Sequence, residues 1–265
     1  MISSKGSRKD VYMAKKQVRT KEVCFQNEQM YIYGKMFFPS VSEEIYDTII
    51  LAHGLGVNHT EMTDYARSFA RAGFAAYIFD FRGGSSNSKS SGTSLDMSVK
   101  TEIEDLNFVI DCLAAKTYVR RLVLFGESMG GFVAAHSAVE RMAHIDKLIL
   151  LYPAFVIPAQ ARKLYPKNKE IPQQISFTYM TVSRKYYEDA RRMSSFGNVL
   201  KYEKDVLIFH GTLDDDVPVS YSRQASDLYK KAHYVEYEKA GHGFTGQDFY
   251  DTVNTTIRFL KGEPL

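Results

Sequence analysis

The chain has 265 residues, 45% of them hydrophobic and 25% charged, which is the composition of an ordinary globular protein with one large domain. Its net charge of +3 comes from residues 1–21, which hold seven Lys or Arg and one Asp, so the remaining chain is net negative. This distribution argues against a nucleic-acid-binding body, and no run of 18 apolar residues is present that would span a bilayer.

The sequence shows no sign of export or of a metal site. No apolar segment follows the N-terminal charges, so no signal peptide is predicted. Cys24 and Cys112 lie far apart and lack the spacing of metal ligands, which favours reduced thiols and a cytoplasmic location. We expect no metal, no cofactor and no nucleic-acid or membrane partner, while a homodimer is left open.

The elements expected along the chain alternate between strands and helices. Residues 1–17 are polar and charged without a regular period, which predicts a flexible basic tail. The segments 22–26 and 30–38 predict an antiparallel pair at one edge of a sheet, joined by a turn at Asn27-Glu28. Apolar strands then alternate with amphipathic helices, which indicates a mostly parallel sheet covered on both faces. The predicted strands are 48–52, 74–79, 121–125, 147–152, 206–209 and 234–238, and the predicted helices are about 60–72, 98–115, 129–141 and 220–231.

A glycine-rich turn, His53-Gly54-Leu55-Gly56, follows the first of these apolar strands. A turn in this position can aim a backbone N–H at an oxygen that becomes negatively charged during acyl transfer. We predict this role for the Leu55 N–H.

The segment Gly126-Glu127-Ser128-Met129-Gly130 lies between an apolar strand and a helix. Gly-x-Ser-x-Gly in this context forms a sharp turn that exposes the serine hydroxyl at the carboxyl edge of the sheet. Glycines flank the serine because a side chain at either position is expected to clash with neighbouring backbone. We therefore predict that Ser128 is a nucleophile and that the Met129 N–H is a second oxyanion donor.

Roughly 50 residues follow the strand 147–152 where this arrangement needs only about one helix. Because they leave the carboxyl edge of the sheet, where such sheets bind ligands, we predict a cap over Ser128 in residues 154–200. The cap is rich in aromatic and basic residues, and its aromatic rings are expected either to line the substrate pocket or to form a small separate core. The predicted substrate-binding residues are Tyr165, Tyr179, Tyr186 and Tyr187.

A serine hydroxyl needs a base before it can attack a carbonyl at neutral pH, and the base needs an orienting carboxylate. His242 lies between two glycines after the strand 234–238 and is the predicted base. Asp214, Asp215 and Asp216 follow the strand 206–209 and compete for the role of the carboxylate.

Together these elements resemble the α/β-hydrolase superfamily from about residue 18 to the C-terminus. The order Ser, Asp, His along the chain is that of this superfamily. In its members the acid is the fourth residue after a His-Gly histidine, which selects Asp214. The loop after Asp80 departs from the usual pattern, since it is longer and richer in serine. The resemblance rests on His53-Gly-Leu-Gly, Asp80-Phe-Arg-Gly-Gly, Gly126-Glu-Ser-Met-Gly-Gly, His210-Gly-Thr-Leu-Asp with Val217-Pro218, and Gly241-His-Gly-Phe.

The compact size and the mid-length insertion are most similar to bacterial feruloyl/cinnamoyl esterases and related carboxylesterases. The resemblance implies an α/β-hydrolase core, in residues 18–153 and 201–265, that cleaves carboxylic esters through an acyl-enzyme intermediate without a cofactor. A lipase, thioesterase or peptidase acting through the same residues is the alternative, and a non-catalytic binding protein on this fold is a further one.

Overall fold

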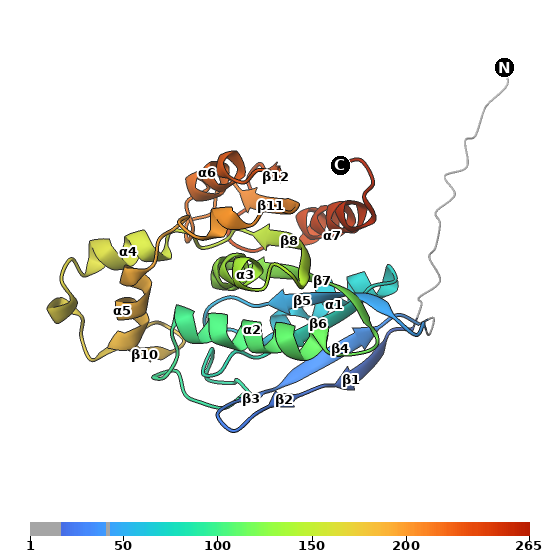
Figure 1. Ribbon diagram of the computed structural model, residues 1–265. Helices are drawn as coiled ribbons and strands as arrows, with labels where there is room; N and C mark the ends of the chain where they lie inside the picture. The colour runs from blue at the N-terminus through green and yellow to red at the C-terminus, as the bar shows by residue number, and fades with distance from the viewer. Residues whose placement is uncertain (1–16, 41–42) are drawn as a thin grey trace, which may run out of the picture.

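The computed structural model describes residues 17–40 and 43–265, so the predicted basic tail, apart from Gln17, lies outside the described residues. An eight-stranded sheet forms the centre of the protein (Figure 1), with the strand order β1-β4-β6-β5-β7-β8-β11-β12. The strands from β6 to β12 in this order are parallel, whereas β1, β4 and β6 pair antiparallel. The sheet strands are β1 (Arg19–Glu22), β4 (Gly34–Phe38), β5 (Tyr46–Ala52), β6 (Ala75–Phe79), β7 (Val119–Glu127), β8 (Ile145–Leu151), β11 (Val206–Gly211) and β12 (Ala232–Tyr237).

Helices cover both faces of this sheet, as the alternation of strands and helices predicts. Side chains of α1 and α7 pack into one core cluster, and those of α2, α3 and α6 pack into another. The helix α3 is buried nearly all round because it lies between the sheet, α2 and the 3-10 helix η3 (Val199–Lys201). The helices are α1 (Thr63–Arg71), preceded by the 3-10 helix η1 (His59–Met62), α2 (Val99–Ala114), α3 (Ser128–Glu140), α6 (Ser220–Leu228) and α7 (Gly246–Lys261).

The N-terminal strands form one interrupted hairpin. β1 pairs with β4, and the short strands β2 (Phe25–Gln26) and β3 (Tyr31–Ile32) continue the same register as a separate pair. The interruption lies at Val23, whose carbonyl oxygen accepts a hydrogen bond from the Tyr77 hydroxyl at 2.8 Å. The predicted pairing is therefore present, but the strand begins earlier than predicted and is broken by this contact.

The insertion between β8 and β11 has its own secondary structure. Figure 1 shows it in yellow and orange, on the side to which the arrows of β5 and β8 point. The helix α5 contacts α4 and α2, which holds the insertion against the body of the protein. Its elements are α4 (Ile157–Leu164), η2 (Asn168–Glu170), β9 (Gln174–Ser176), β10 (Thr181–Ser183), α5 (Arg184–Arg192) and η3 (Val199–Lys201).

Within the described part of the chain, no helix combines the length and the apolar character needed to cross a membrane.

Candidate active site

Ser128 lies at a strained turn between β7 and α3. Its φ angle is 51°, in the left-handed region that residues with a side chain rarely adopt. The flanking glycines are required by space, because a Cβ on Gly126 would lie 2.5 Å from the Gly130 carbonyl oxygen. A Cβ on Gly130 would lie 2.4 Å from the carbonyl oxygens of Ala52 and His53. The turn therefore packs directly against the end of β5, and this contact fixes the position of the serine.

His242 and Asp214 lie in line with this serine. The Nε2 atom of His242 is 3.0 Å from the Ser128 Oγ, and its Nδ1 atom is 2.8 Å from the Asp214 Oδ2. The His242 side chain is 23% exposed, whereas that of Asp214 is fully buried. With Nδ1–H donating to the carboxylate, Nε2 carries the lone pair and can accept the serine proton.

The loop after β11 fixes the Asp214 carboxylate. Its Oδ1 accepts hydrogen bonds from the backbone N–H groups of Asp216 at 2.9 Å and Val217 at 2.8 Å. Its Oδ2 also lies 3.2 Å from the Nε2 of His210, which is fully buried. Burial alone raises the pKa of Asp214, but the hydrogen bonds from His210, His242 and Val217 outweigh it, so the pKa lies below its ordinary value. The carboxylate is therefore ionised at neutral pH.

The surroundings of His242 favour its charged form. Burial lowers the pKa of His242, but the hydrogen bond and charge of Asp214 outweigh this effect, with smaller contributions from Asp216 and Glu127. The pKa of His242 therefore lies above its ordinary value. Its ring also packs against Tyr152, with the ring centroids 4.6 Å apart.

Glu127, next to the serine, is buried behind this arrangement. Its Oε2 accepts a hydrogen bond of 2.9 Å from the hydroxyl of Tyr152. Burial raises the pKa of Glu127 to about 7, although Tyr152 and the Gly54 backbone amide favour the charged form. The bond to Tyr152 makes Glu127 a structural acceptor, and Glu127 also reaches the cavity described below.

Two free backbone N–H groups lie beside Ser128. Met129 is the second residue of α3, so its N–H belongs to the first turn of the helix, where no carbonyl of the helix accepts it. The Leu55 N–H donates to no acceptor among the described residues. The turn that carries Leu55 packs against the serine, since a Cβ on Gly54 would lie 3.4 Å from the Ser128 Cβ. Leu55 and Met129 therefore both line the cavity beside Ser128, and their role as oxyanion donors stays a prediction.

A cavity of about 610 Å³ opens above Ser128. This volume is within the usual range for sites that bind small molecules. The sheet body and the insertion both contribute walls. The body contributes Gly54, Leu55, Gly56, Val57, Glu61, Glu127, Ser128, Met129, Tyr152, Asp216, Val217, His242 and Gly243, and the insertion contributes Ala154, Val156, Ile157, Gln160, Phe177, Tyr179, Tyr186 and Tyr187.

A family model described as serine aminopeptidase, S33, matches residues 43–238, which is most of the chain. The chain belongs to this family of α/β hydrolases. It is therefore a hydrolase, with a mostly parallel sheet typical of that superfamily.

Individual relatives agree with this assignment. The uncharacterized protein YqkD of Bacillus subtilis (strain 168) is 28% identical over 230 residues, which cover 78% of this chain and 72% of YqkD. Est1E from Butyrivibrio proteoclasticus, solved with ferulic acid bound, superposes with a TM-score of 0.84 at 22% identity, covering 91% of this chain and 98% of Est1E. A monoacylglycerol lipase from Paleococcus ferrophilus superposes with a TM-score of 0.66 at 20% identity, covering 88% and 99%. At these identities the two structures show the fold alone.

The four predicted substrate-binding tyrosines divide into two groups. Tyr179, Tyr186 and Tyr187 line the cavity, whereas Tyr165 does not and packs against Tyr187 with ring centroids 4.9 Å apart. The Tyr179 ring lies directly on the turn formed by residues 53–56, because a Cβ on Gly56 would meet it at 2.2 Å. The insertion therefore reaches the turn that carries Leu55.

Several cavity residues were not singled out from the sequence. Tyr152 follows β8 at the carboxyl edge, the same signal that located the other residues of the site. Phe177 was one of several cap aromatics that the sequence does not rank. Glu61 has no sequence signal, since it reaches the cavity only because η1 follows the turn formed by residues 53–56.

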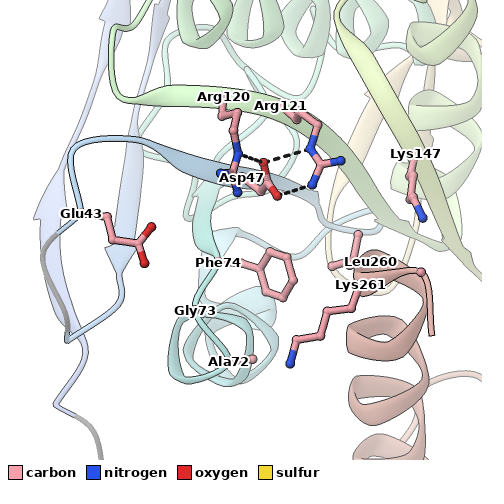
Figure 2. A pocket seen from close by; sticks show the side chains of 11 residues that line it. Glu43, Asp47, Ala72, Gly73, Phe74, Arg120, Arg121, Lys147, Leu260 and Lys261 are labelled. Atoms are coloured by element: carbon pink, nitrogen blue, oxygen red, sulfur yellow. Dashed lines mark hydrogen bonds and ion pairs between the residues drawn. The ribbon is translucent and has the colours of Figure 1, made fainter.

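A second cavity, of about 380 Å³, lies at the opposite edge of the sheet, between the starts of β5 and β7 and the end of α7. Figure 2 shows Asp47 held between Arg120 and Arg121, with Nε–Oδ1 distances of 2.8 and 3.0 Å. The Nζ of Lys147 donates to a carbonyl oxygen at the end of α7. Arg120, Arg121 and Lys147 therefore form structural contacts that link strands and the end of α7, and we assign no chemistry to this cavity.

Across residues 17–40 and 43–265, no three His, Cys, Asp or Glu side chains are grouped to hold a metal ion.

Proposed function

We propose that this hydrolase cleaves carboxylic esters through a covalent acyl-enzyme intermediate. The observation that carries the proposal is the hydrogen-bonded line from Ser128 Oγ through His242 to the Asp214 carboxylate, at the floor of a cavity of about 610 Å³. A nucleophile, a base in reach of it and a group that orients the base are the parts that acyl transfer needs.

The first half of the reaction forms the acyl-enzyme. The Ser128 Oγ attacks the ester carbonyl carbon while His242 Nε2 takes the hydroxyl proton. The N–H groups of Leu55 and Met129 stabilise the negative charge on the carbonyl oxygen. The imidazolium, stabilised by Asp214, then donates its proton to the alcohol oxygen as the C–O bond breaks and the alcohol leaves.

The second half reverses these roles with water. His242 takes a proton from a water molecule, the resulting hydroxide attacks the acyl carbon, and the proton returns to Ser128 as the acid is released. No cofactor takes part in either half.

The walls of the cavity favour an aromatic or medium-length acyl group. Phe177, Tyr179, Tyr186 and Tyr187 place aromatic rings on the side formed by the insertion. Such rings can stack on a flat acyl group, which contributes about 0.5–1.5 kcal/mol per ring pair beyond the burial of apolar area. We therefore propose hydroxycinnamate-type esters as substrates, a proposal that the fold similarity to Est1E, solved with ferulic acid, supports.

A second candidate is the cleavage of peptide amides with a free amino group. The family description favours it, and the same serine, histidine and aspartate support amide cleavage.

The test is a panel of p-nitrophenyl esters, methyl hydroxycinnamates and amino-acid p-nitroanilides, assayed with the wild type and Ser128→Ala. We expect ester turnover that exceeds anilide turnover and that falls to background in Ser128→Ala. Anilide turnover above ester turnover supports the second candidate, and activity retained within a few-fold in Ser128→Ala contradicts the assignment of the nucleophile.

A further inference from the structure

The walls of the cavity carry acidic side chains and no basic one. Apart from His242 and the tyrosines, the ionisable residues that line it are Glu61, Glu127 and Asp216. Neither Lys nor Arg lines the cavity anywhere in the described part of the chain. Glu61 and Asp216 are exposed to solvent at its walls, whereas Glu127 is buried beside the serine.

The basic residues of the insertion do not compensate for these carboxylates. None of them lines the cavity, although the sequence places eight of them in residues 155–200. Arg162 donates to the carbonyl oxygens of Arg191 and Met193 at 3.1 and 2.9 Å, and Arg184 pairs with Glu188 at 2.8 Å. Arg162 and Arg184 therefore hold the insertion together outside the cavity, and no basic residue of the insertion lines the cavity to accept a phenolate or carboxylate of a substrate.

Two of the cavity carboxylates lie on the same side as His242. Asp216 belongs to the loop of Asp214 and donates its backbone N–H to that carboxylate at 2.9 Å. Both Asp216 and Glu127 are close enough to contribute to the raised pKa of His242, and Glu61 is close enough to Glu127 to contribute to the raised pKa of that carboxyl. Since His242 must give its proton to the leaving oxygen, the alcohol part of an ester lies on this side. The aromatic wall of the insertion is then left for the acyl part.

On the basis of the proposed ester hydrolysis, we propose that the enzyme prefers esters whose alcohol carries a positive charge, such as an ammonium group, and discriminates against alcohols that carry a carboxylate. A cation beside Glu61 and Asp216 is attracted by both, and no Lys or Arg lines the cavity to compete for them. An anion in the same place is repelled by both. For partly exposed charges several ångströms apart, we expect about a tenfold difference in kcat/KM for each unit of substrate charge.

Three butyrate esters of similar size test this proposal. Butyrylcholine carries the cation, 3,3-dimethylbutyl butyrate is its neutral isostere, and 2-carboxyethyl butyrate carries an anion. We expect kcat/KM to decrease in that order at low ionic strength, mainly through KM. Both ratios should shrink at 1 M salt, because the Debye length falls to about 3 Å.

A variant pair links the preference to the cavity. Glu61 is exposed and lines the cavity, so Glu61→Gln removes a charge with little risk to folding. We expect it to lower the ratio of choline ester to neutral ester about threefold to fivefold. The control is Asp227→Asn, which removes an exposed carboxylate on α6 outside the cavity and should leave the ratio unchanged.

The outcomes separate this inference from the proposed function. Turnover of the neutral ester with a choline-to-neutral ratio near one, or a preference for the carboxylate ester, overturns the charge preference and leaves ester hydrolysis standing. An equal fall of the ratio in Glu61→Gln and Asp227→Asn assigns the preference to the overall charge of the protein and also overturns the inference. If none of these esters nor any ester of the wider panel is hydrolysed, ester hydrolysis itself is contradicted.

Discussion

Replacing Asp214 by Asn tests the proposed charge arrangement with little change of shape. The Asn oxygen can keep the hydrogen bonds from the backbone of Asp216 and Val217, which leaves the NH₂ group in the place of Oδ2. That group then faces the Nδ1 of His242 across 2.8 Å and the Nε2 of His210 across 3.2 Å. Because an amide NH₂ only donates, His242 must accept at Nδ1 and carry its proton on Nε2.

The consequence for the reaction is large. With the proton on Nε2, His242 presents an N–H to Ser128 Oγ at 3.0 Å in place of a lone pair, and the base is lost. Attack then depends on a minor tautomer, so we expect kcat to fall about 10⁴-fold, or about 5.5 kcal/mol in the barrier. KM should change much less, because Asp214 does not line the cavity.

The pH dependence should change as well. The neutral imidazole is the active form, and Asp214 raises the pKa of His242, so wild-type activity should appear as pH rises through a value above the ordinary histidine pKa of about 6.5. Without that carboxylate the imidazolium is less stable, and the acid limb of the residual activity should move to lower pH. Steady-state kinetics with p-nitrophenyl acetate from pH 5 to 9 measures both effects.

The neighbouring carboxylate provides the control. Asp215 is exposed and makes no described contact with His242, so Asp215→Asn should stay within about twofold of the wild type. If Asp214→Asn stays within tenfold, or if Asp215→Asn is as damaging, the assignment of Asp214 is wrong.

Three further predictions follow from the same geometry. Gly130→Ala places a Cβ 2.4 Å from two backbone oxygens, so the free energy of unfolding, measured by thermal unfolding, should fall by about 2–3 kcal/mol and activity should decrease. An unchanged melting temperature would contradict the close approach of the backbone at this glycine. Tyr186→Ala should raise KM for a methyl hydroxycinnamate about threefold to tenfold and barely change turnover of p-nitrophenyl acetate, whereas Tyr165→Ala, outside the cavity, should affect KM less. Equal losses of activity on both esters would show that the insertion only supports the fold. Dialysis against EDTA should leave activity unchanged, and activity that returns only with added metal contradicts the cofactor-free mechanism.

The main features of the fold were predictable because the hydrophobic pattern of short sequence segments determines them. Val206 to Phe209 is apolar at every position and becomes a fully buried strand, as expected for a parallel sheet covered on both faces. Gly126 and Gly130 were predictable because the sharp turn at Ser128 leaves no space for a side chain on either side of the serine. Once the strand order of an α/β hydrolase is assumed, the carboxyl ends of β7, β11 and β12 bring Ser128, Asp214 and His242 to one edge.

Features that depend on tertiary contacts could not be predicted in the same way. Nothing local distinguishes Tyr165 from Tyr186, and only the packing of α4 against α5 decides which ring reaches the cavity. The negative walls of the cavity likewise arise because Glu61 and Asp216, far apart in sequence, face the same space. The break in the N-terminal hairpin depends on Tyr77, which reaches it from a neighbouring strand.

The most direct test of the central claim is to map where a fluorophosphonate probe reacts. We predict one label per chain on Ser128, located by tandem mass spectrometry in the tryptic peptide 122–141, which also contains Ser137 as an internal control. Labelling should be absent in Ser128→Ala and slowed by orders of magnitude in His242→Ala, because the hydroxyl then has no base. No label on the folded wild type, or a label on any residue other than Ser128, would contradict the account.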